Sequence, residues 1–507
     1  MIIQSLIRRI MRKALLFGMV FLLSFTSCND WLELYPENAQ VASQYWETKA
    51  DVEAVLSAGY VRLRGSVDKL FVWGEVRGNG IALFNIGQDD NTRAAQRIRS
   101  MDILPSNPYA KWGEMYQVIN IANSVIKYGP EVVEMDDSFT NEELNSFLSE
   151  AYFLRSLAYF YLVRTYRDVP YITQPYVNDD EKFEVEKTAG DLILNYLVDD
   201  LEKALVAAKE FFPEVDNEHP MNTKGRATKW TIHALLADIY LWQGNYEACM
   251  TACDHIVDSR RVGLISNWFL NFFPGNSNES IFEIQYSYDR GQTNGFADWF
   301  DVSPRYLASL PTVQVFSETQ GFGDVRGVNG SFLMDGSTLG IWKYMGLDYY
   351  DVSTAKRSSI QNDQNFIVYR LADILLMKAE ALVMTENFEA AIGILNQIRA
   401  RAGIEGDLNP AATEFEMLQL VMKERHRELF AEGKRWFDLL RVAKRDDYRY
   451  LNYLIQEVTS VVPLSSLAIV SSKLMNTDSH YLPIHQDELN ANQLLIQNPY
   501  YSNLGNQ

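Results

Sequence analysis

The sequence is poor in cysteine, in histidine and in positive charge. It has three cysteines, six histidines, and 46 lysines and arginines against 66 acidic residues in 507 residues. Cys249 and Cys253 are the only cysteines after Cys28, and they lie four residues apart in a helical pattern. A metal site needs further ligands and a disulfide needs a different geometry, so both are predicted to be small core residues. The acidic excess excludes nucleic acid and anionic lipid headgroups as partners.

Catalytic signatures are also missing. The sequence contains no H-E-x-x-H, no G-x-x-x-x-G-K-[ST], no G-x-S-x-G, and no G-x-G-x-x-G after a strand. His233 lies on the apolar face of "WTIHALLADIY" and is predicted to be a packed core histidine. No cofactor is expected. No calcium loop of the form D-x-[DN]-x-[DN]-G occurs, but "GQDDN" and other Asp-rich loops leave a structural calcium ion open.

Long apolar runs are absent except at the N-terminus. A basic segment precedes a 12-residue apolar core from Ala14 to Phe25, which is shorter than the ~20 residues that span a bilayer. Small residues follow directly before Cys28, so residues 1–27 are predicted to be a cleaved signal peptide. Met11 would by itself begin a complete signal, which leaves open whether residues 1–10 are translated.

Cys28 is predicted to be a lipidation site. In a bacterial lipoprotein signal, the thiol of the new first residue receives the lipid. Phe25 stands where the consensus has an aliphatic residue, and the alternative is a plain secretory signal with an incidental cysteine. Removing residues 1–27 takes away four of the 46 basic residues and no acidic one, which leaves a formal charge of −24. Because this charge opposes adhesion to an anionic surface, a covalent anchor with two or more acyl chains is the expected tether.

The rest of the chain is predicted to be mainly helical. Apolar residues recur at helical spacing over Lys111 to Gly129, Asn141 to Ile172 and Thr188 to Phe212. Two further segments show the spacing of tetratricopeptide helix pairs, with matching residues at offsets 0, 3, 7, 9 and 12. These residues are Ala237, Tyr240, Gly244, Tyr246 and Cys249 in the first pair, and Ala379, Leu382, Glu386, Phe388 and Ala391 in the second.

Two regions have a different character. The segment from roughly Gly263 to Gln364 is rich in Gly, Asn, Ser and Asp, with short strand-like pieces such as "SIFEIQYSY". A similar loop region runs from Phe71 to Arg93. The predicted organisation is one domain over residues 28–507, with a helical body (roughly 40–262 and 365–507) and a loop-rich insertion (roughly 263–364). Aromatic-bearing loops on a rigid helical body are where binding sites usually lie.

Several blocks resemble the SusD/RagB family of Bacteroidetes outer-membrane lipoproteins. They are "SCNDWLELYPEN", "KWGEMYQVINIANSVI", "AYFLRSLAYFYLVRTYRDVPYI", "YRLADILLMKAEAL", "ERHRELFAEGKRWFDLLR" and "YLPIHQDELNANQLLIQNPYY". The resemblance implies a tetratricopeptide-like helical scaffold with a less regular lobe. It also implies a lipid-anchored protein that faces the cell exterior, captures oligosaccharides without chemistry on them, and partners a SusC-like TonB-dependent transporter in nutrient uptake.

The expected mode of capture is stacking of sugar rings on aromatic side chains, with hydrogen bonds from polar neighbours. The resemblance implies that binding residues lie in these loops but vary with the ligand, so none is carried over by motif. The candidates are Trp73, Asn79, Phe84, Asn85, Trp299, Tyr306, Trp342 and Tyr350.

Three other functions stay open. The same scaffold could bind a peptide or another solute, or it could act as a tetratricopeptide adaptor for protein partners alone. A surface glycoside hydrolase would need a carboxylate pair, for which Glu424, Glu428 and Glu432 are available. These glutamates alternate with arginines, and the predicted pairs are Glu424–Arg427 and either Glu428 or Glu432 with Arg435. Such pairing predicts a low pKa, whereas a glycosidase acid needs a raised one.

Overall fold

The computed structural model describes residues 45–502 except 88, 178–183, 215–219, 302, 337, 348–355 and 359. The chain forms two compact units, Met1–Glu47 and Thr48–Gln507, and every element below belongs to the second. The predicted signal peptide, Cys28 and Tyr350 lie outside the described residues.

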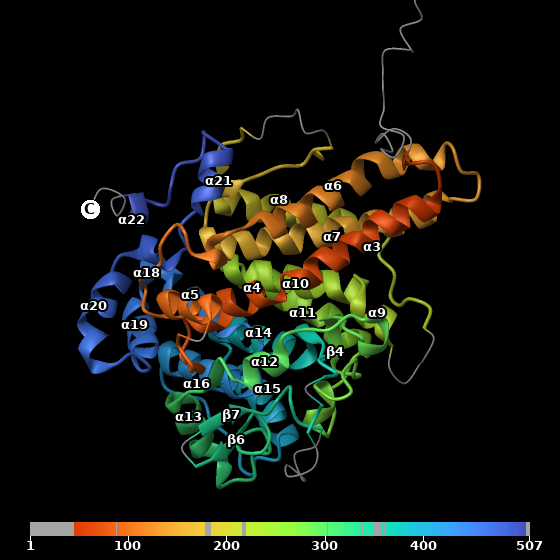
Figure 1. Cartoon of the computed structure of the whole chain (residues 1–507). Helices are drawn as coiled ribbons and strands as arrows, with labels where there is room; N and C mark the ends of the chain where they lie inside the picture. Colours follow the sequence, from red (N-terminus) through yellow and green to blue (C-terminus); the bar gives the residue numbers. More distant parts are fainter. Residues whose placement is uncertain are drawn as a thin grey trace, which may run out of the picture. The chain divides into compact units, whose positions relative to one another are not determined.

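The first four long helices form a layer of neighbours that begins the scaffold (Figure 1). They are α3 (Lys49–Gly65), α6 (Gly113–Val133), α7 (Asn141–Tyr166) and α8 (Gly190–Leu205). The helix α7 begins at a capping box, in which the Thr140 hydroxyl accepts from the Glu143 amide at 3.2 Å and the Glu143 carboxylate accepts from the Thr140 amide at 3.1 Å. It packs against both α6 and α8 and is buried on nearly every side. All three predicted helices of this part are confirmed, although α8 ends earlier than expected.

Two helix pairs follow the predicted tetratricopeptide spacing. The first is α10 (Lys229–Gln243) with α11 (Tyr246–Ser259), and the second is α14 (Leu371–Met384) with α15 (Phe388–Arg401). Gly244 closes the first turn in the left-handed conformation at φ +78°, and Glu386 takes the corresponding place in the second turn at φ +60°. Cys249 and Cys253 are buried free thiols on α11, as predicted.

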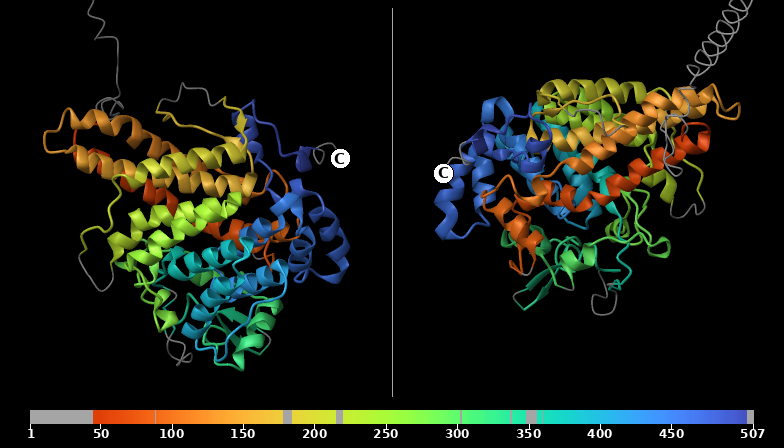
Figure 2. Two further views of the ribbon diagram at one scale, coloured as in Figure 1. Left: turned by 180° about the vertical axis from the view of Figure 1, so that it is seen from behind. Right: turned by 45° about the horizontal axis from the view of Figure 1, so that its top comes forward.

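The helix pairs stack into one continuous scaffold (Figures 1 and 2). The helix α8 packs on α10, α11 on α14, and α14 on α16 (Glu414–Glu428). The C-terminal part flanks this stack with α17 (Arg435–Ala443), α18 (Arg445–Tyr448), α19 (Leu451–Thr459), α20 (Leu464–Leu474), η6 (Thr477–His480), α21 (Gln486–Ala491) and α22 (Pro499–Ser502). The mainly helical, tetratricopeptide-like class is therefore confirmed.

The segment from Phe71 to Arg93 is more regular than the loop that was predicted. It follows α4 (Val67–Phe71) and contains the π-helical turn η2 (Val72–Val76), the strand β1 (Ile81–Leu83) and the start of α5 (Asp90–Arg99). The strand β1 pairs with the insertion, where Ile81 lies opposite Ala308 of β5 (Tyr306–Ala308). The prediction of a loop missed this order because the partner strand is distant in sequence.

The insertion carries four of the eight strands in the described part of the chain, β4 to β7. A four-stranded antiparallel sheet has the order β1-β5-β7-β6, where β6 is Phe332–Asp335 and β7 is Thr338–Ile341. A separate pair of strands lies at the two ends of the insertion, where β4 (Ser280–Ile284) pairs with β8 (Phe366–Arg370). The strand β4 is fully buried. The remaining elements are η3 (Pro108–Ala110), β2 (Val169–Pro170), β3 (Lys187–Thr188), α9 (Met221–Gly225), η4 (Trp268–Asn271), η5 (Tyr288–Arg290), α12 (Phe296–Phe300) and α13 (Leu310–Gln320).

A buried ionic network, here called the glutamate network, fastens the insertion to the scaffold. Its acidic members are Glu279, Asp324, Glu424, Glu428 and Glu432, and its basic members are Arg326, Lys343, Arg370, Arg401 and Arg427. Arg326 Nη1 lies 2.7 Å from Glu424 and 2.8 Å from Glu428. Lys343 Nζ lies 2.6 Å from Glu432. Charges buried this deeply require such pairing.

This network corrects one sequence prediction and confirms another. The pair Glu424–Arg427 forms at 3.2 Å, as expected for an i,i+3 contact. Arg435, however, pairs with Glu457 at 2.8 Å and with neither Glu428 nor Glu432. The prediction failed because α16 ends at Glu428, so the two predicted partners no longer share a helix face with Arg435.

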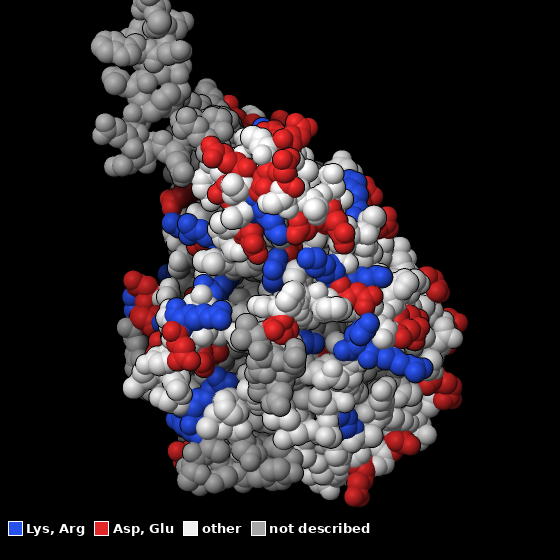
Figure 3. Space-filling view, turned by 90° about the vertical axis from the view of Figure 1, so that its right-hand side faces the viewer, with Lys and Arg blue, Asp and Glu red and all other residues white. Residues whose placement is uncertain are grey.

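The exposed surface carries both charge signs. On the face shown in Figure 3, acidic side chains gather in the upper part, and uncharged surface is wide below. Exposed acidic residues near the end of α6 and the start of α7 are Glu131, Glu134, Asp137 and Glu142. Among the residues that the structure describes, no helix combines the length and the hydropathy needed to cross a bilayer.

Candidate ligand-binding site

A pocket opens where the scaffold meets the insertion, and we call it the junction pocket. Its volume is about 550 Å³, which is within the range of small-molecule sites. The end of α3, the start of α4 and the first turns of α6 form one side. The segment after β4 and the helix α12 form the other side. Its principal lining residues are Arg62, Arg64, Asp68, Gln117, Tyr286, Asn294 and Trp299.

Trp299 is the largest aromatic side chain of the junction pocket. Its indole is 6% exposed and lies against Gly295, where an added Cβ would be 2.8 Å from the indole nitrogen. Behind it, the ring packs on Phe71 at 5.4 Å and on Phe296 at 5.0 Å between centroids. The surrounding rings hold the indole in one orientation, which favours recognition of a flat ligand surface at low entropic cost.

Asp68 is the most unusual polar group of this pocket. One carboxylate oxygen accepts a hydrogen bond from the Tyr109 hydroxyl at 3.1 Å. The other oxygen is buried and has no hydrogen-bond partner among the described residues. Burial raises the pKa of Asp68 above its ordinary value. This oxygen has the capacity to accept a further hydrogen bond.

The other polar groups are partly committed to holding the pocket together. The Tyr286 hydroxyl donates to the Arg64 carbonyl at 3.1 Å, which ties the insertion to the end of α3. Asn294 donates to the Gln364 carbonyl at 2.5 Å and accepts from the Phe296 amide at 3.0 Å. Arg62 is exposed, and its side chain has no hydrogen-bond or ion-pair partner among the described residues. The lining thus offers donors, acceptors and one rigid aromatic ring.

The structure places the predicted ligand-binding residues in three settings. Trp299 lines the junction pocket, and Tyr306 lies behind it with its ring 5.1 Å from Phe71. Phe84 is 42% exposed beside the insertion, where its amide donates to the Arg305 carbonyl. Asn85 follows it and donates to the Pro304 carbonyl at 3.2 Å.

The other predicted residues are interior. Trp73 is 1% exposed and donates its indole N–H to the Tyr109 carbonyl at 2.8 Å. Asn79 is 2% exposed and binds Glu457 and Arg435 through its side-chain amide. Trp342 is 3% exposed and packs against Gly346. Their rings and amides meet protein groups in this structure. Among the described aromatic candidates, Phe84 is exposed, and Trp299 is largely buried but lines the junction pocket.

The sequence analysis missed six of the seven principal lining residues: Arg62, Arg64, Asp68, Gln117, Tyr286 and Asn294. Arg62 and Arg64 sit at the end of a helix that looked like scaffold, and Asp68 follows them by one turn. A usable signal was present in "RLRGSVDK", where charged residues and a glycine interrupt the helical pattern directly before the Phe71–Arg93 region.

The carboxylates considered for hydrolysis lie inside the protein. Glu424, Glu428 and Glu432 are at most 2% exposed and belong to the glutamate network. Burial alone would raise the pKa of Glu428, but Arg401, Arg370 and Arg326 outweigh it and hold that pKa well below its ordinary value. Burial would also raise the pKa of Glu432, but Arg370 and Lys343 outweigh burial and lower that pKa. A general acid needs the opposite shift, so these glutamates have a structural role.

The buried histidine and the possible metal ligands complete the description of the titratable groups. His233 is 6% exposed. Burial, and to a smaller extent the neighbouring His255, lowers its pKa to about 4, as expected for a packed core histidine. Within the described parts of the chain, no group of three or more His, Cys, Asp or Glu side chains is arranged to hold a metal ion.

The stacked helix pairs and the inserted sheet define a tetratricopeptide-like scaffold protein with one inserted lobe. Two family models match successive parts of the chain. The SusD family model matches residues 317–501, and a SusD-like model described as "Starch-binding associating with outer membrane" matches residues 30–241. The chain belongs to the SusD/RagB family.

Individual relatives agree with this assignment. SusD-like protein P38 of Formosa agariphila is 26% identical over 471 residues, which cover 82% of this chain and 88% of that protein. A SusD-like protein of Bacteroides ovatus is 21% identical over 493 residues, covering 88% of this chain and 85% of the relative.

Solved structures share the fold. A SusD superfamily protein from Bacteroides vulgatus superimposes with a TM-score of 0.71 at 19% identity, covering 90% of this chain and all of that one. A structure described as a laminarin binding SusD-like protein gives a TM-score of 0.70 at 21% identity over 90% of this chain and 100% of its own.

Proposed function

We propose that this protein is a cell-surface lipoprotein that captures oligosaccharides in the junction pocket and passes them to a SusC-like TonB-dependent transporter. The observation that carries the proposal is the junction pocket itself. It combines a rigid indole (Trp299) with a buried carboxylate oxygen of Asp68 and the guanidinium of Arg62, neither of which has a partner among the described residues. An aromatic face and several hydrogen-bonding groups are what a sugar ring, with its apolar C–H faces and hydroxyls, requires.

The comparisons support a glycan as the ligand class. One matching family model describes starch-binding proteins that associate with the outer membrane, and one structural neighbour is described as laminarin binding. The pocket also carries charges of both signs, which suits a neutral polyhydroxylated ligand. Arg62 and Arg64 are positive, and Asp68 and Glu114 are the acidic residues. Glu114 is itself paired with Lys69.

The experiment is a polysaccharide array followed by calorimetric titration of the chain from residue 29 onward. Trp299→Ala is expected to weaken binding at least tenfold, which corresponds to about 1.4 kcal/mol. Asp68→Asn keeps the side-chain shape and is expected to weaken binding by about tenfold through the lost acceptor. Phe322→Ala is the matched control, because Phe322 is 57% exposed and lies outside the junction pocket.

Two outcomes would redirect the proposal. Binding of peptides but of no polysaccharide would assign the pocket to a peptide-binding member of the same scaffold. Sustained release of reducing ends from a bound glycan would show a hydrolase, which the binder proposal excludes.

The anchor and the partner are tested separately. Cys28→Ala is expected to move the protein out of the outer-membrane fraction while its thermal unfolding stays unchanged, because lipid attachment alone holds the chain at the membrane. If the variant still fractionates with the membrane, another tether is present. Co-purification of a TonB-dependent barrel with the native protein would support the transporter partnership, provided that an unrelated lipoprotein washed at the same high stringency does not retain the barrel.

A further inference from the structure

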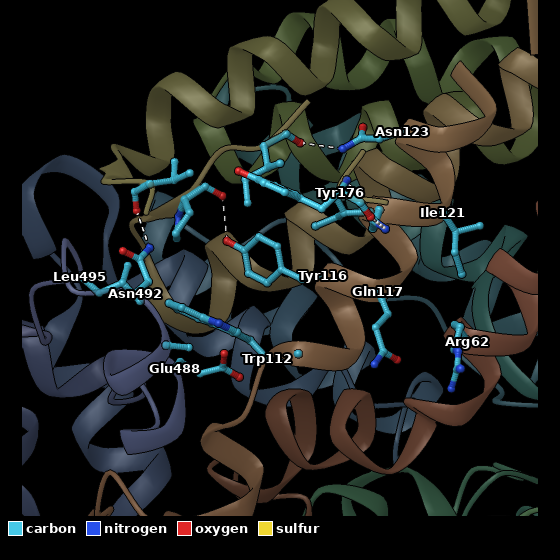
Figure 4. A pocket seen from close by; sticks show the side chains of 17 residues that line it. Arg62, Trp112, Tyr116, Gln117, Ile121, Asn123, Tyr176, Glu488, Asn492 and Leu495 are labelled. Atoms are coloured by element: carbon cyan, nitrogen blue, oxygen red, sulfur yellow. Dashed lines mark hydrogen bonds between the residues drawn. The ribbon is translucent and has the colours of Figure 1, made fainter. Parts of the chain in front are cut away.

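A second pocket lies beside the junction pocket, and we call it the α6 pocket (Figure 4). Its volume is about 500 Å³. The first turns of α6 form its floor, and the segment around β2 and the C-terminal α21 form its walls. Trp112 and Tyr116 stand next to each other in the floor, with ring centroids 5.7 Å apart, and Tyr176 approaches from the wall.

The polar groups deep in the α6 pocket are already used. The Tyr116 hydroxyl donates to the Pro170 carbonyl at 2.7 Å. Asn120 exchanges two hydrogen bonds with the backbone of Tyr176, at 3.0 and 2.7 Å. Asn492 donates to the Val185 carbonyl at 2.7 Å. A ligand inside this pocket therefore meets mainly aromatic and aliphatic surface.

The unused polar groups lie at the border between the two pockets. Arg62 and Gln117 line both the α6 pocket and the junction pocket. Both are exposed, and within the described chain neither side chain has a hydrogen-bond or ion-pair partner. Figure 4 shows them together at one end of the α6 pocket, with Trp112 and Tyr116 further in. The two pockets thus adjoin at a pair of available donors.

We propose that the α6 pocket is an extension subsite for the same glycan chain that occupies the junction pocket. This inference rests on the proposed function. The ligand would be an oligosaccharide long enough to reach from Trp299, past Arg62 and Gln117, to the Tyr116 ring. Its hydroxyls bind at the border, and the C–H face of a terminal sugar stacks in the α6 pocket. The preferred substrate class is then an extended chain and not a mono- or disaccharide.

The linkage between the pockets has a thermodynamic consequence. Once the junction pocket holds one end of a chain, the other end reaches the α6 pocket as an intramolecular event, with a high effective concentration. Affinity should therefore rise with chain length until both pockets are filled and then level off. A step of about tenfold is expected between the short and the long members of one ladder.

The test uses a blocking substitution that removes no internal contact. Ala491 lines the α6 pocket from α21 and is exposed, so Ala491→Trp would fill the cavity. Gln493→Trp places the same side chain on an exposed neighbour that does not line the pocket, and serves as the matched control. The probes are oligosaccharide ladders of laminarin and of starch, and of any other polysaccharide that the array shows to bind.

The expected result has two parts. The unmodified chain from residue 29 binds long oligosaccharides about tenfold more tightly than short ones. Ala491→Trp brings the long ones down to the affinity of the short ones and leaves the short ones unchanged, and Gln493→Trp changes neither. Affinity that does not depend on length, or that Ala491→Trp leaves intact for long chains, overturns the extension subsite while the proposed function stands. No binding to any polysaccharide on the array overturns both.

Discussion

Glu428 is the residue whose loss should destabilise the protein most clearly. It is fully buried, and its carboxylate lies against Arg326, Arg370 and Arg401 while also accepting from the Trp268 indole at 3.2 Å. Three cations pair with this one carboxylate, so Glu428→Gln removes a buried negative charge that all three share.

The size of the effect follows from the burial. Removing one partner of a buried ion pair costs about 3–5 kcal/mol, because the remaining charge stays out of water. The whole free energy of unfolding of a typical domain is only about 5–15 kcal/mol. Because the unfolding entropy is about 2.1 cal/mol/K per residue, a unit of about 460 residues shifts by about 1 °C per kcal/mol. The midpoint of thermal unfolding should therefore fall by about 3–5 °C.

The assays are thermal unfolding and urea unfolding of Glu428→Gln, each monitored by circular dichroism. Glu210→Gln is the matched control, since Glu210 pairs with Arg261 at 3.1 Å on the surface and its loss should cost about 0–1 kcal/mol. The double variant Glu428→Gln with Arg401→Met should recover part of the loss, because it removes one uncompensated cation. If Glu428→Gln costs no more than Glu210→Gln, the network does not fasten the insertion as described.

Three more predictions concern stability. Burial opposes the shift, but Lys434 and Arg425 lower the pKa of Asp373 to about 2, and Arg441 and Arg445 do the same for Glu380. These folded-state pKa values lie below the unfolded ones, so the stability that the two carboxylates contribute is present above about pH 4.5 and is lost as pH falls toward 2. Urea unfolding at pH 3 and at pH 6 measures this loss. Burial raises the pKa of Glu75 to about 7, so the stability contributed by its protonated form is full below about pH 4.5 and is lost as pH rises through 7. The free energy of unfolding of Glu75→Gln should therefore rise by about 3 kcal/mol relative to that of the unmodified chain between pH 4.5 and pH 8.5. A difference that does not change with pH would contradict this. Glu386→Gly should stabilise the chain by about 1 kcal/mol because it relieves a left-handed conformation at φ +60°. Gly244→Ala should destabilise the chain by a similar amount. If thermal unfolding shows that both substitutions shift the midpoint in the same direction, the reasoning is refuted.

The helical scaffold was predictable because its signals are local. Apolar spacing locates α6 and α7 within a few residues, and the tetratricopeptide offsets locate both helix pairs with their turns. Each of these signals lies within one or two helical segments. The same holds for Cys249 and Cys253, whose place on the buried face of α11 follows from periodicity alone.

The inserted lobe and the site were less predictable because they depend on distant contacts. The three-residue strands β1 and β5 carry almost no periodic signal, and only their pairing orders the region around Ile81. The aromatic residues expected to face a ligand also reveal their burial only in three dimensions. Trp73, for example, donates to the Tyr109 carbonyl in the interior, while Trp299 reaches a pocket. The segment "RLRGSVDK" signals a break in the helix, but only the structure shows that one oxygen of Asp68 has no donor among the described residues.

The most direct test of the central claim is a crystal structure of the chain from residue 29 with a bound oligosaccharide from the array. The account predicts a sugar ring stacked on Trp299, with a hydroxyl within hydrogen-bonding distance of Asp68 in the junction pocket. A glycan bound on another face of the scaffold, with the junction pocket filled by water alone, would contradict it.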